Sequence, residues 1–574
     1  MVLASLWFGT SLDLHAQLPG NAEISRPPSF STPAWSIDEI GESYCWIPGL
    51  WVTRWGERGQ LRWPVLDGVL PVGLGVDGLP QVSLLLGLSD LRLPGSTFPQ
   101  SVTDARGSLG YTSGPLPSVE VIPRWSLPER PRSELSYSAG AYGFSSIAAQ
   151  HGQPLGKSLT VWLEGGDAAY DGYELGASTR AYSIRTRALY QLNPKVAFRL
   201  STQKGVGEQH LPHPLVFVPF SGFLPERQKG TFVRHDGRLD LLLSRGLAVK
   251  AGFQMLRERW EWGLPPLTSS LPDRLSRSLI YAATGGGTWS AEILSARQTI
   301  SDRGAHEAHW CEFGARTSRT IPIGSGAKAV FAAGLVQVAQ RRTPEGSLQI
   351  VWSPAGYRLA ARVLREPFVP PAISRIRVSG KADATLASRT AAEVAGERQG
   401  AWGTLVVELS RSLYGDLPTP SPLGQGGSPW ACRPWETERI SLVIRTPSVA
   451  GFQLRAKGDS YTNPVPGYPS LVLRAEVSYT DTLFSGDLPC RLSLQVEGSR
   501  WMRGALPSGI AQFLPWDRRP SPYWAFTALI SARYRDALFY AELSWCPPGH
   551  REILPALEAE PLWASWGVRV VLWD

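Results

Sequence analysis

The chain has 574 residues, of which 43% are hydrophobic and only 18% are charged, and its formal net charge is +8. Ordinary soluble domains contain about 25% charged residues, so this chain is poor in charge without being strongly apolar. No stretch approaches the ~18 consecutive apolar residues of a membrane-spanning helix, which excludes a helical membrane protein. The basic residues, 49 arginines and 8 lysines, form no stripe or tail, so nucleic-acid binding has little support.

The first 34 residues predict export from the cytoplasm. Residues 1–16 hold an apolar run that ends at Ala16, a small residue of the kind found at signal-peptide cleavage sites, but they lack a positive n-region. We interpret them as a truncated signal peptide, with an ordinary apolar N-terminus as the alternative. Residues 17–34 contain four prolines and little periodic pattern, which predicts an extended periplasmic linker.

Five cysteines are spread over the chain, at Cys45, Cys311, Cys432, Cys490 and Cys546. Their spacing shows no CxxC pattern and no neighbouring histidine pair, which excludes an obvious zinc site and a dense disulfide framework. A bridge between Cys432 and Cys490, or between Cys490 and Cys546, is conceivable in an oxidising compartment. The odd number leaves at least one thiol unpaired.

From about Arg132 to the end, apolar and polar residues alternate in short segments separated by turns. Alternation of period two places one set of side chains on each face of a strand, and a sheet this long must split or close. The clearest predicted hairpins span residues 182–201, 238–255 and 525–545, with tight turns at 192–194, 245–246 and 535–536. Longer Pro- and Gly-rich connections such as Leu417–Trp430 lie between them. Short turns on one side and long loops on the other are typical of an outer-membrane barrel.

The alternating region therefore predicts an all-β fold, a large transmembrane antiparallel β-barrel over residues 131–574. At roughly 20 residues for each strand and its connection, it accommodates about 22 strands. The 23 Trp, 17 Tyr and 18 Phe residues are consistent with aromatic girdles at the two membrane interfaces. A large soluble β core is the alternative origin of these aromatic residues.

Residues 35–130 contain a series of short motifs in a characteristic order. Ser36–Glu42 is followed by Pro48-Gly49, then Arg62, then Asp77-Gly78-Leu79-Pro80, then Leu88–Leu91. This order resembles the plug domain of TonB-dependent outer-membrane receptors, with its short helix, its strand entry, its arginine-bearing strand and its Asp-Gly-x-Pro turn.

Two segments after the plug-like region extend the resemblance into the barrel. Ser136–Gly143 resembles the first barrel strand of the family, and Leu163–Tyr173 resembles the second strand running into the first external loop. Trp63 stands where the family usually has glycine after the arginine, and Gly114–Pro123 replaces the usual glycine-rich stretch.

The resemblance implies a small N-terminal α+β plug domain inside the lumen of the barrel, over residues 35–130, and uptake of a scarce small solute across the cell outer membrane of a Gram-negative-type bacterium. The implied partners are outer-membrane lipid, the barrel-assembly machinery and TonB, with no cofactor. The plug residues given a structural role are Pro48, Gly49, Arg62, Asp77, Gly78 and Pro80. Residues 17–34 contain no convincing TonB box, so a passive porin or a receptor-derived barrel no longer coupled to TonB is the alternative.

The chain shows no catalytic constellation, so we expect no enzyme activity. An outer-membrane barrel enzyme or a soluble β protein is therefore the least favoured class. The spacing of His210 and His213 is better explained by chance within a loop than by a metal site. Glu258 and Glu261 indicate a polar strand end rather than a pair of catalytic acids. We expect the solute to contact external loops such as Leu417–Trp430 and arginines that face the lumen, because long loops over a rigid scaffold concentrate binding residues.

Overall fold

The computed structural model describes residues 130–574 except 173–177, 211–215, 219–221, 225–226, 244–246, 263–271, 287, 303–306, 369–386, 421–429, 465–468, 484–487, 501–520, 555–556, 559 and 574. Before residue 130 it describes Trp46, Pro48, Gly49 and the strands β1 to β9. All regular elements among the described residues are β-strands. No helix in this part of the chain has the length and apolarity needed to cross a membrane.

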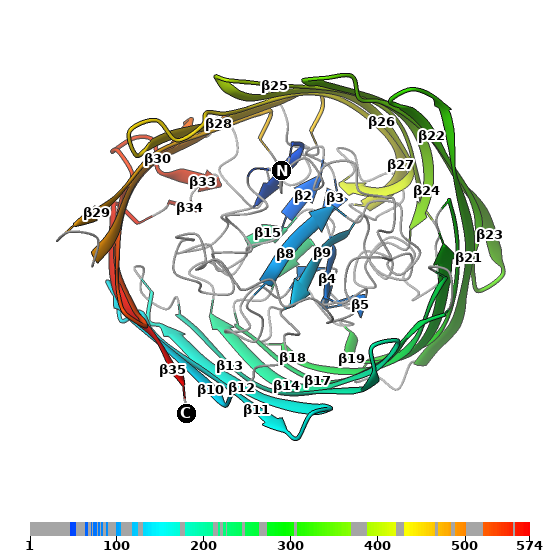
Figure 1. Ribbon diagram of the computed structural model, residues 1–574, viewed down its shortest axis with the longest axis horizontal. Coiled ribbons are helices and arrows are strands. Elements are labelled where there is room, and N and C mark those ends of the chain that lie inside the picture. Colours follow the sequence, from blue (N-terminus) through cyan, green and yellow to red (C-terminus); the bar gives the residue numbers. More distant parts are fainter. Residues whose placement is uncertain are drawn as a thin grey trace.

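Twenty-two antiparallel strands form one closed barrel (Figure 1). The predicted all-β class, the closed barrel and the number of strands are thus confirmed. The barrel strands are β10 (Arg132–Gly140), β11 (Ser145–Leu155), β12 (Leu159–Tyr170), β13 (Ser178–Asn193), β14 (Val196–His210), β17 (Arg227–Leu242), β18 (Ala248–Trp262), β19 (Pro272–Gly286), β20 (Trp289–Asp302), β21 (Glu307–Gly324), β22 (Ala327–Val338), β23 (Arg341–Trp352), β24 (Tyr357–Phe368), β25 (Ala387–Gly400), β26 (Gly403–Pro420), β27 (Trp430–Arg445), β28 (Phe452–Tyr461), β29 (Leu471–Leu483), β30 (Leu488–Arg500), β31 (Tyr523–Tyr534), β32 (Ala537–Trp545) and β35 (Leu562–Trp573).

The first and last barrel strands close the sheet. β10 pairs antiparallel with β35 from Arg132 opposite Trp573 to Gly140 opposite Ser565. Across this seam Tyr137 and Trp566 stack edge to face, with ring centroids 5.8 Å apart. Closure satisfies the backbone groups that an open sheet would leave at its edges, which is a requirement for strands in a lipid bilayer.

The two ends of the barrel differ in their connections. The three predicted hairpins are confirmed as the pairs β13–β14, β17–β18 and β31–β32, and the β31–β32 turn contains Arg535 with a φ of 52°. The start of β10 and the end of β35 lie at the same end as these short turns. The opposite end carries the longest connections, residues 369–386 and 501–522. We refer to it as the long-loop end.

Two predictions about particular segments were wrong in detail. Leu163–Tyr173 belongs largely to β12, the third strand of the barrel, because β11 is already formed by Ser145–Leu155. The predicted loop Leu417–Trp430 begins with strand, since β26 continues to Pro420 and pairs there with Trp430. β25 pairs with β26 only as far as Gly415. Pro418 and Pro420 therefore lie where β26 pairs with β27 alone. Such an edge position tolerates proline, because no second strand needs the N–H that proline lacks.

Neither conceivable disulfide is present, because Cys490 is a free thiol, as are Cys311 and Cys546. Cys490 lies near the short-turn end of β30, whereas Cys432 and Cys546 lie at the long-loop ends of β27 and β32. A disulfide requires Cα atoms within ~7 Å, a distance that opposite ends of a barrel do not allow.

The N-terminal strands form small sheets separate from the barrel. In Figure 1 they lie inside the ring of barrel strands. They are β1 (Leu50–Val52), β2 (Pro64–Leu66), β3 (Leu70–Pro71), β4 (Gly73–Val76), β5 (Leu79–Pro80), β6 (Val82–Ser83), β7 (Leu88–Ser89), β8 (Pro99–Asp104) and β9 (Ser118–Pro123). Four of them form the sheet β5-β4-β9-β8, in which β4 and β9 are parallel. The helix expected at Ser36–Glu42 lies outside the described residues.

Two pairs of short strands lie within long-loop connections. They are β15 (Val216–Val218) with β16 (Gly222–Leu224), and β33 (Glu552–Leu554) with β34 (Leu557–Glu558).

Candidate functional site

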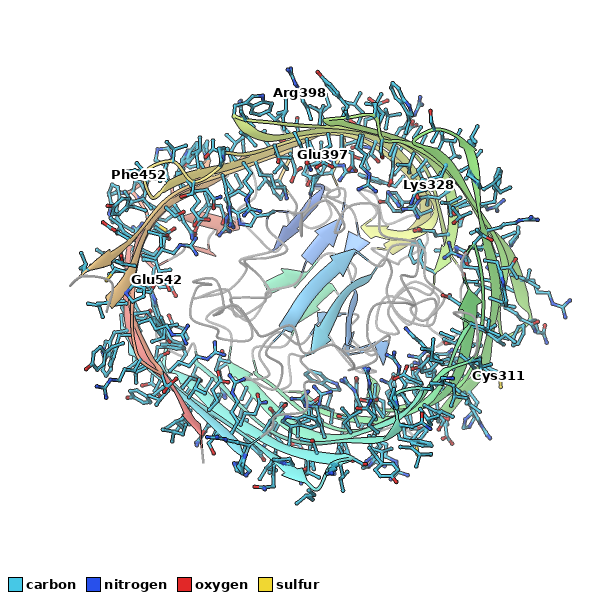
Figure 2. All side chains as sticks on the ribbon, viewed as in Figure 1. Cys311, Lys328, Glu397, Arg398, Phe452 and Glu542 are labelled. Carbon is cyan, nitrogen blue, oxygen red and sulfur yellow. The ribbon has the colours of Figure 1, made fainter. Side chains whose placement is uncertain are left out.

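The strands of the barrel separate polar from apolar side chains at every second position. On β13, Ser183, Arg185 and Arg187 are buried on the inner face, whereas Tyr182 and Ile184 are exposed on the outer face. Figure 2 shows the same arrangement at two adjacent residues of β25, where Glu397 points into the barrel and Arg398 points away from it. The lumen is therefore lined by polar and charged groups, and the exterior is mainly apolar.

Most charged groups of the inner wall are paired with an opposite charge on the same strand, on the neighbouring strand or, for Arg316 and Glu345, on the next strand but one. Buried arginine is stable in this setting because its planar guanidinium makes several directed hydrogen bonds to carboxylates. The pairs include Arg187 with Glu164, Arg199 with Asp240 (3.2 Å), Arg316 with Glu345 (3.0 Å), Arg389 with Glu393 (2.9 Å), Arg474 with Glu497 (3.2 Å), Arg491 with Glu476 (2.7 Å) and Arg569 with Glu134. These charges stabilise the wall, because removing one partner would leave the other buried without compensation.

One part of this wall holds the N-terminal segment. The backbone N–H of Gly49 donates a hydrogen bond of 3.0 Å to Oδ1 of Asp459 on β28. The hydroxyl of Tyr461, two residues further along the same strand, donates to the carbonyl oxygen of Gly49 at 3.5 Å. Both side chains are buried, and Asp459 is fully so. The turn at Pro48 and Gly49 is thus bound through both backbone groups of one residue.

Charged groups on β28 itself and on nearby strands of the wall complete this contact. Lys457 lies 2.8 Å from Oδ2 of Asp459, and Arg439 of β27 forms a close ion pair with Glu408 of β26. The guanidinium of Arg474 on β29 lies over the ring of Trp46, 5.4 Å from its centroid, a cation–π geometry. We call the Pro48-Gly49 turn and the wall residues Arg439, Asp459 and Tyr461 the junction.

Two separate observations favour glycine at position 49. Its φ of +70° lies in the left-handed region, which residues with a Cβ atom adopt only at a cost. A Cβ atom built there would also lie 1.3 Å from Nη1 and 2.3 Å from Cζ of Arg439. The turn and the wall therefore approach each other so closely that any other residue at position 49 would require the side chain of Arg439 to shift.

The structure places only some of the predicted plug residues. Pro48 and Gly49 are both buried at the junction, whereas Arg62, Asp77 and Gly78 lie outside the described residues. Pro80 belongs to β5, in a different sheet, where it is paired with Gly75. The motif residues that can be placed therefore do not gather at one point, and Pro48-Gly49 is the pair among them that contacts the barrel.

The sequence analysis did not identify the wall residues of the junction, although the sequence of β28 indicates that its inward side chains need specific partners. Lys457, Asp459 and Tyr461 stand at alternate positions, so their side chains share one face of the strand, and all three are buried. A buried Lys–Asp pair on a strand requires specific partners. The sequence does not show which distant backbone supplies them, because Gly49 is 410 residues away.

The remaining candidate sites do not assemble. Glu258 is buried on the inner face of β18, whereas Glu261 lies on the outer face beside Arg259, so they are not paired acids. His210 contacts Glu208 at 3.3 Å, and His213 lies outside the described residues. Within the described ranges, no group of three or more His, Cys, Asp or Glu residues has the arrangement of a metal site.

Several solved structures share this fold. They include the siderophore receptor PirA of Acinetobacter baumannii, with a TM-score of 0.71 and 11% identity over 93% of this chain and 96% of that chain. The FrpB iron transporter of Neisseria meningitidis has a TM-score of 0.71 and 10% identity, with 94% and 97% covered. The copper transporter OprC has a TM-score of 0.69 and 13% identity, with 92% and 94% covered.

No protein-family model and no curated protein sequence matches the chain. At identities this low, the similarity to solved structures establishes the fold. The fold that the sequence resemblance implied, the large barrel of TonB-dependent outer-membrane receptors, is confirmed.

Proposed function

We propose that this protein is an outer-membrane transporter of the TonB-dependent receptor type, in which residues 35–130 plug the barrel and a scarce solute passes when the plug is displaced. The junction is the observation that supports it most directly. There the N-terminal segment is bound to the inner face of the barrel through Gly49, Asp459 and Tyr461. The outward apolar face supports insertion in the outer membrane of a Gram-negative-type bacterium.

The size of the barrel favours a plug over an open channel. Side chains fill the interior of an eight-stranded barrel, whereas a 22-stranded barrel has a lumen wide enough to require a domain inside it. An unfilled lumen would let solutes leak across the membrane. The short strands β1 to β9 would bury too little apolar surface to be stable as a separate domain of this size, which supports a position inside the barrel.

The chemistry of the junction suits a plug that must move. Its contacts are hydrogen bonds and charged groups, and a hydrogen bond to a charged group such as the Asp459 carboxylate contributes about 1.5–3 kcal/mol net when it is exchanged for water. An apolar interface of similar size would resist wetting much more strongly. Displacement of the N-terminal segment from Asp459 would therefore require moderate work, within reach of an external energy source such as TonB.

The similar structures suggest a class of solute. Their names refer to a siderophore, to iron and to copper, so we infer that the solute is a metal ion or a metal chelate. We propose that the solute first contacts the external loops, because long loops over a rigid barrel concentrate binding residues.

The Asp77-Gly78-Leu79-Pro80 sequence retains its structural role in this proposal. β4 and β5 pair with Val76 opposite Leu79, a register in which the sequence between the strands is two residues long. Asp-Gly is a preferred pair for such a hairpin connection, which supports a turn within the plug rather than a ligand site.

Conductance in planar lipid bilayers tests the plug. Deleting residues 35–130 should leave an assembled barrel with a large steady conductance, while the full chain should remain nearly closed. Assembly is checked by the different mobility of unheated and boiled samples in SDS gels. A full chain that conducts as well as the deletion would indicate a passive porin.

Coupling to TonB requires a separate measurement. A pull-down of the full chain with a TonB C-terminal domain should show binding that increases when the solute is present. A closed, plugged barrel that never binds TonB would indicate a receptor-derived barrel that has lost its energy coupling.

A further inference from the structure

The wall of the barrel is interrupted near the long-loop end, between β23 and β24. Their ladder ends in that direction with Gly346 opposite Arg365. β23 nevertheless continues to Arg341 in full pairing with β22, and β24 continues to Phe368 in full pairing with β25. The two strands thus keep their outer neighbours, while their facing edges are not paired with each other. We call this place the fork.

Two prolines explain why the ladder stops. Two positions beyond the last pair, the register places Pro344 opposite Pro367. Each proline remains in an intact ladder on its other side, opposite Leu335 of β22 and Ser388 of β25 respectively. Because proline has no N–H, it must occupy a non-hydrogen-bonded pair in those ladders, so its nitrogen points to the opposite side, towards the fork. The pair that should continue the ladder can therefore make neither of its two hydrogen bonds.

Two buried carboxylates face each other between the last ladder pair and the prolines. Glu345 and Glu366 both point inward, and they are only 8% and 5% exposed. Like charges directly opposite each other destabilise a strand pair. Oε2 of Glu345 and both carboxylate oxygens of Glu366 accept no hydrogen bond from any residue that the structure describes. Buried oxygens without a donor are costly, so water that enters the fork would stabilise them.

The ion pairs of these carboxylates divide along the same line. Glu345 pairs with Arg316 of β21 at 3.0 Å, on the β23 side of the fork. Glu366 pairs with Arg362 of its own strand and with Arg389 of β25, both at 3.7 Å. Among the described residues, no ion pair joins β23 to β24. The charges therefore hold each strand on its own side and do not close the fork.

β22 and β23 end beside the fork in a short turn, although most connections at this end are long. Two residues join the strands, and the first of them, Ala339, has a φ of 52°. β22 is paired with β21 as far as Val338, and the N–H of Ala339 donates to the carbonyl oxygen of Cys311 at 2.9 Å. We call the tip of this hairpin, Leu335–Glu345, the flap. It is attached to β21 on one side and lacks a ladder to β24 on the other.

The fork lies just beyond the apolar band of the exterior. The outward residues of β24 between Tyr357 and Arg365 are all apolar, and Arg365 is the first charged one. This segment spans ~27 Å along the strand, or ~21 Å along the axis of a barrel whose strands tilt by ~40°. Because the apolar band of such barrels is about 25 Å tall, the fork lies at the level of the lipid head groups. Water there can hydrogen-bond backbone groups that the hydrocarbon interior would leave unsatisfied.

We propose that the barrel wall parts at the fork. The flap turns away from β24 about its attachment to β21, and the gap admits water and small polar solutes to the lumen from the side. Glu345, Glu366, Arg316 and Arg389 line the gap, and these charged groups favour polar solutes over hydrocarbon chains. This side opening is additional to the proposed uptake through the plug. It depends on the barrel in the outer membrane and not on displacement of the plug.

Thiol reactivity measures the side opening in the full chain, reconstituted in lipid vesicles with its five native cysteines replaced by serine. S347C places a reporter on the inner face of β23 just below the fork, and S544C places a matched half-buried reporter on the inner face of β32. The test variant adds P344V and P367V, which supply the missing N–H groups. This ladder repair should slow the reaction of S347C with a charged methanethiosulfonate roughly tenfold or more, the effect of two hydrogen bonds, and leave S544C unchanged.

Distances between nitroxide labels show directly whether the two edges separate. R342C with S388C spans the fork on the outer face. L348C with V394C spans the same three strands below the fork, with the same offset along the strands. In electron paramagnetic resonance the upper pair should be farther apart by ~5 Å or more, about one strand spacing. Ladder repair should bring the upper pair to the distance of the lower pair.

Equal distances for the two label pairs would overturn the proposal, as would a reaction of S347C that ladder repair does not slow. Equal slowing of S347C and S544C would also overturn it, because the effect would then belong to the whole barrel and not to the fork. Heat-modifiable mobility in SDS gels checks that each variant is folded. If the ladder-repair variant does not assemble, the two label pairs in the chain that retains both prolines decide the question.

Discussion

Arginine occurs on both walls of the same barrel under opposite conditions. On the inner face of β13, Arg187 is almost fully buried and paired with Glu164, whereas on the outer face of the same strand Arg180 is 71% exposed in its contact with Asp167. Burial makes an ion pair obligatory, because a lone charge in the wall has no water to solvate it. Exposure leaves an arginine available for other partners, so the outer wall can bind ligands that the inner wall cannot.

The largest difference between the two walls should appear when one arginine is removed from each. Arg187→Met leaves Glu164 buried without its partner and should lower the free energy of unfolding by ~3–5 kcal/mol. Arg180→Met, on the same strand, should change it by at most ~1 kcal/mol. Urea unfolding in detergent, followed by tryptophan fluorescence, measures both. Similar losses for the two variants would show that burial does not govern the contribution of these pairs.

Replacing both members of the inner pair is a sharper form of this test. Arg187→Met combined with Glu164→Met removes the charge and its partner together, so much of the stability lost in the single variant should return. A double variant less stable than the single one would mean that the pair is coupled to further groups, such as the ring of Trp162, which lies 5.3 Å from the guanidinium of Arg187.

The junction should respond to a single added methyl group. Gly49→Ala introduces strain of ~1–3 kcal/mol at a positive φ and places a Cβ atom against Arg439, so the N-terminal segment should detach from the wall and the barrel should conduct intermittently. Gly156→Ala is the matched control, since Gly156 has a φ of +78° and no atom within 4 Å of the added Cβ. The control should lose stability, but its barrel should remain closed. If Gly49→Ala and Gly156→Ala both conducted, backbone strain alone would explain the opening, without the contact to Arg439.

The plug turn and the long loop are predicted to fail in different ways. Gly78→Val should lower the amount of assembled protein, because valine is disfavoured wherever a turn needs a positive φ. Shortening Leu417–Trp430 should leave assembly intact and change binding or uptake of the solute. Heat-modifiable mobility and a solute-binding assay distinguish the two. The assigned roles would be reversed if Gly78→Val assembled normally but lost solute binding. The loop deletion would then have no effect on solute binding or uptake.

The smallest expected effect concerns an outer arginine near the short-turn end. Arg398 lies 5.5 Å from the ring centroid of Tyr357 and 6.0 Å from that of Trp402. Arg398→Gln should lower the free energy of unfolding by ~0.5–1 kcal/mol for each lost contact at this exposed site. Tyr357→Phe retains the ring and should be nearly neutral. A larger loss in Tyr357→Phe than in Arg398→Gln would assign the contribution to the hydroxyl instead.

Local patterns in the sequence determine the strands of this protein and its large antiparallel barrel. Alternation of period two does not depend on distant partners, and turns such as Arg535-Asp536 follow from residues in direct succession. The parity of a spacing carries information too: an odd separation places Glu258 and Glu261 on opposite faces of β18, so the sequence was enough to reject them as an acid pair. The order of the first three barrel strands differs from the prediction, because β11 has polar residues, His151 and Gln153, at outward positions, which weakens its alternating pattern.

Only the closed barrel decides which groups meet across hundreds of residues. Gly49 contacts Asp459, Arg569 pairs with Glu134, and Arg259 stands opposite Arg274, and none of these neighbours is visible in a linear pattern. Register and closure determine them, since a shift of one residue along a strand would turn every side chain to the other face. The sequence thus determined that the barrel wall has a polar inner face and an apolar outer face. The tertiary structure decided which charged side chains are buried in ion pairs and which are exposed on the outer face.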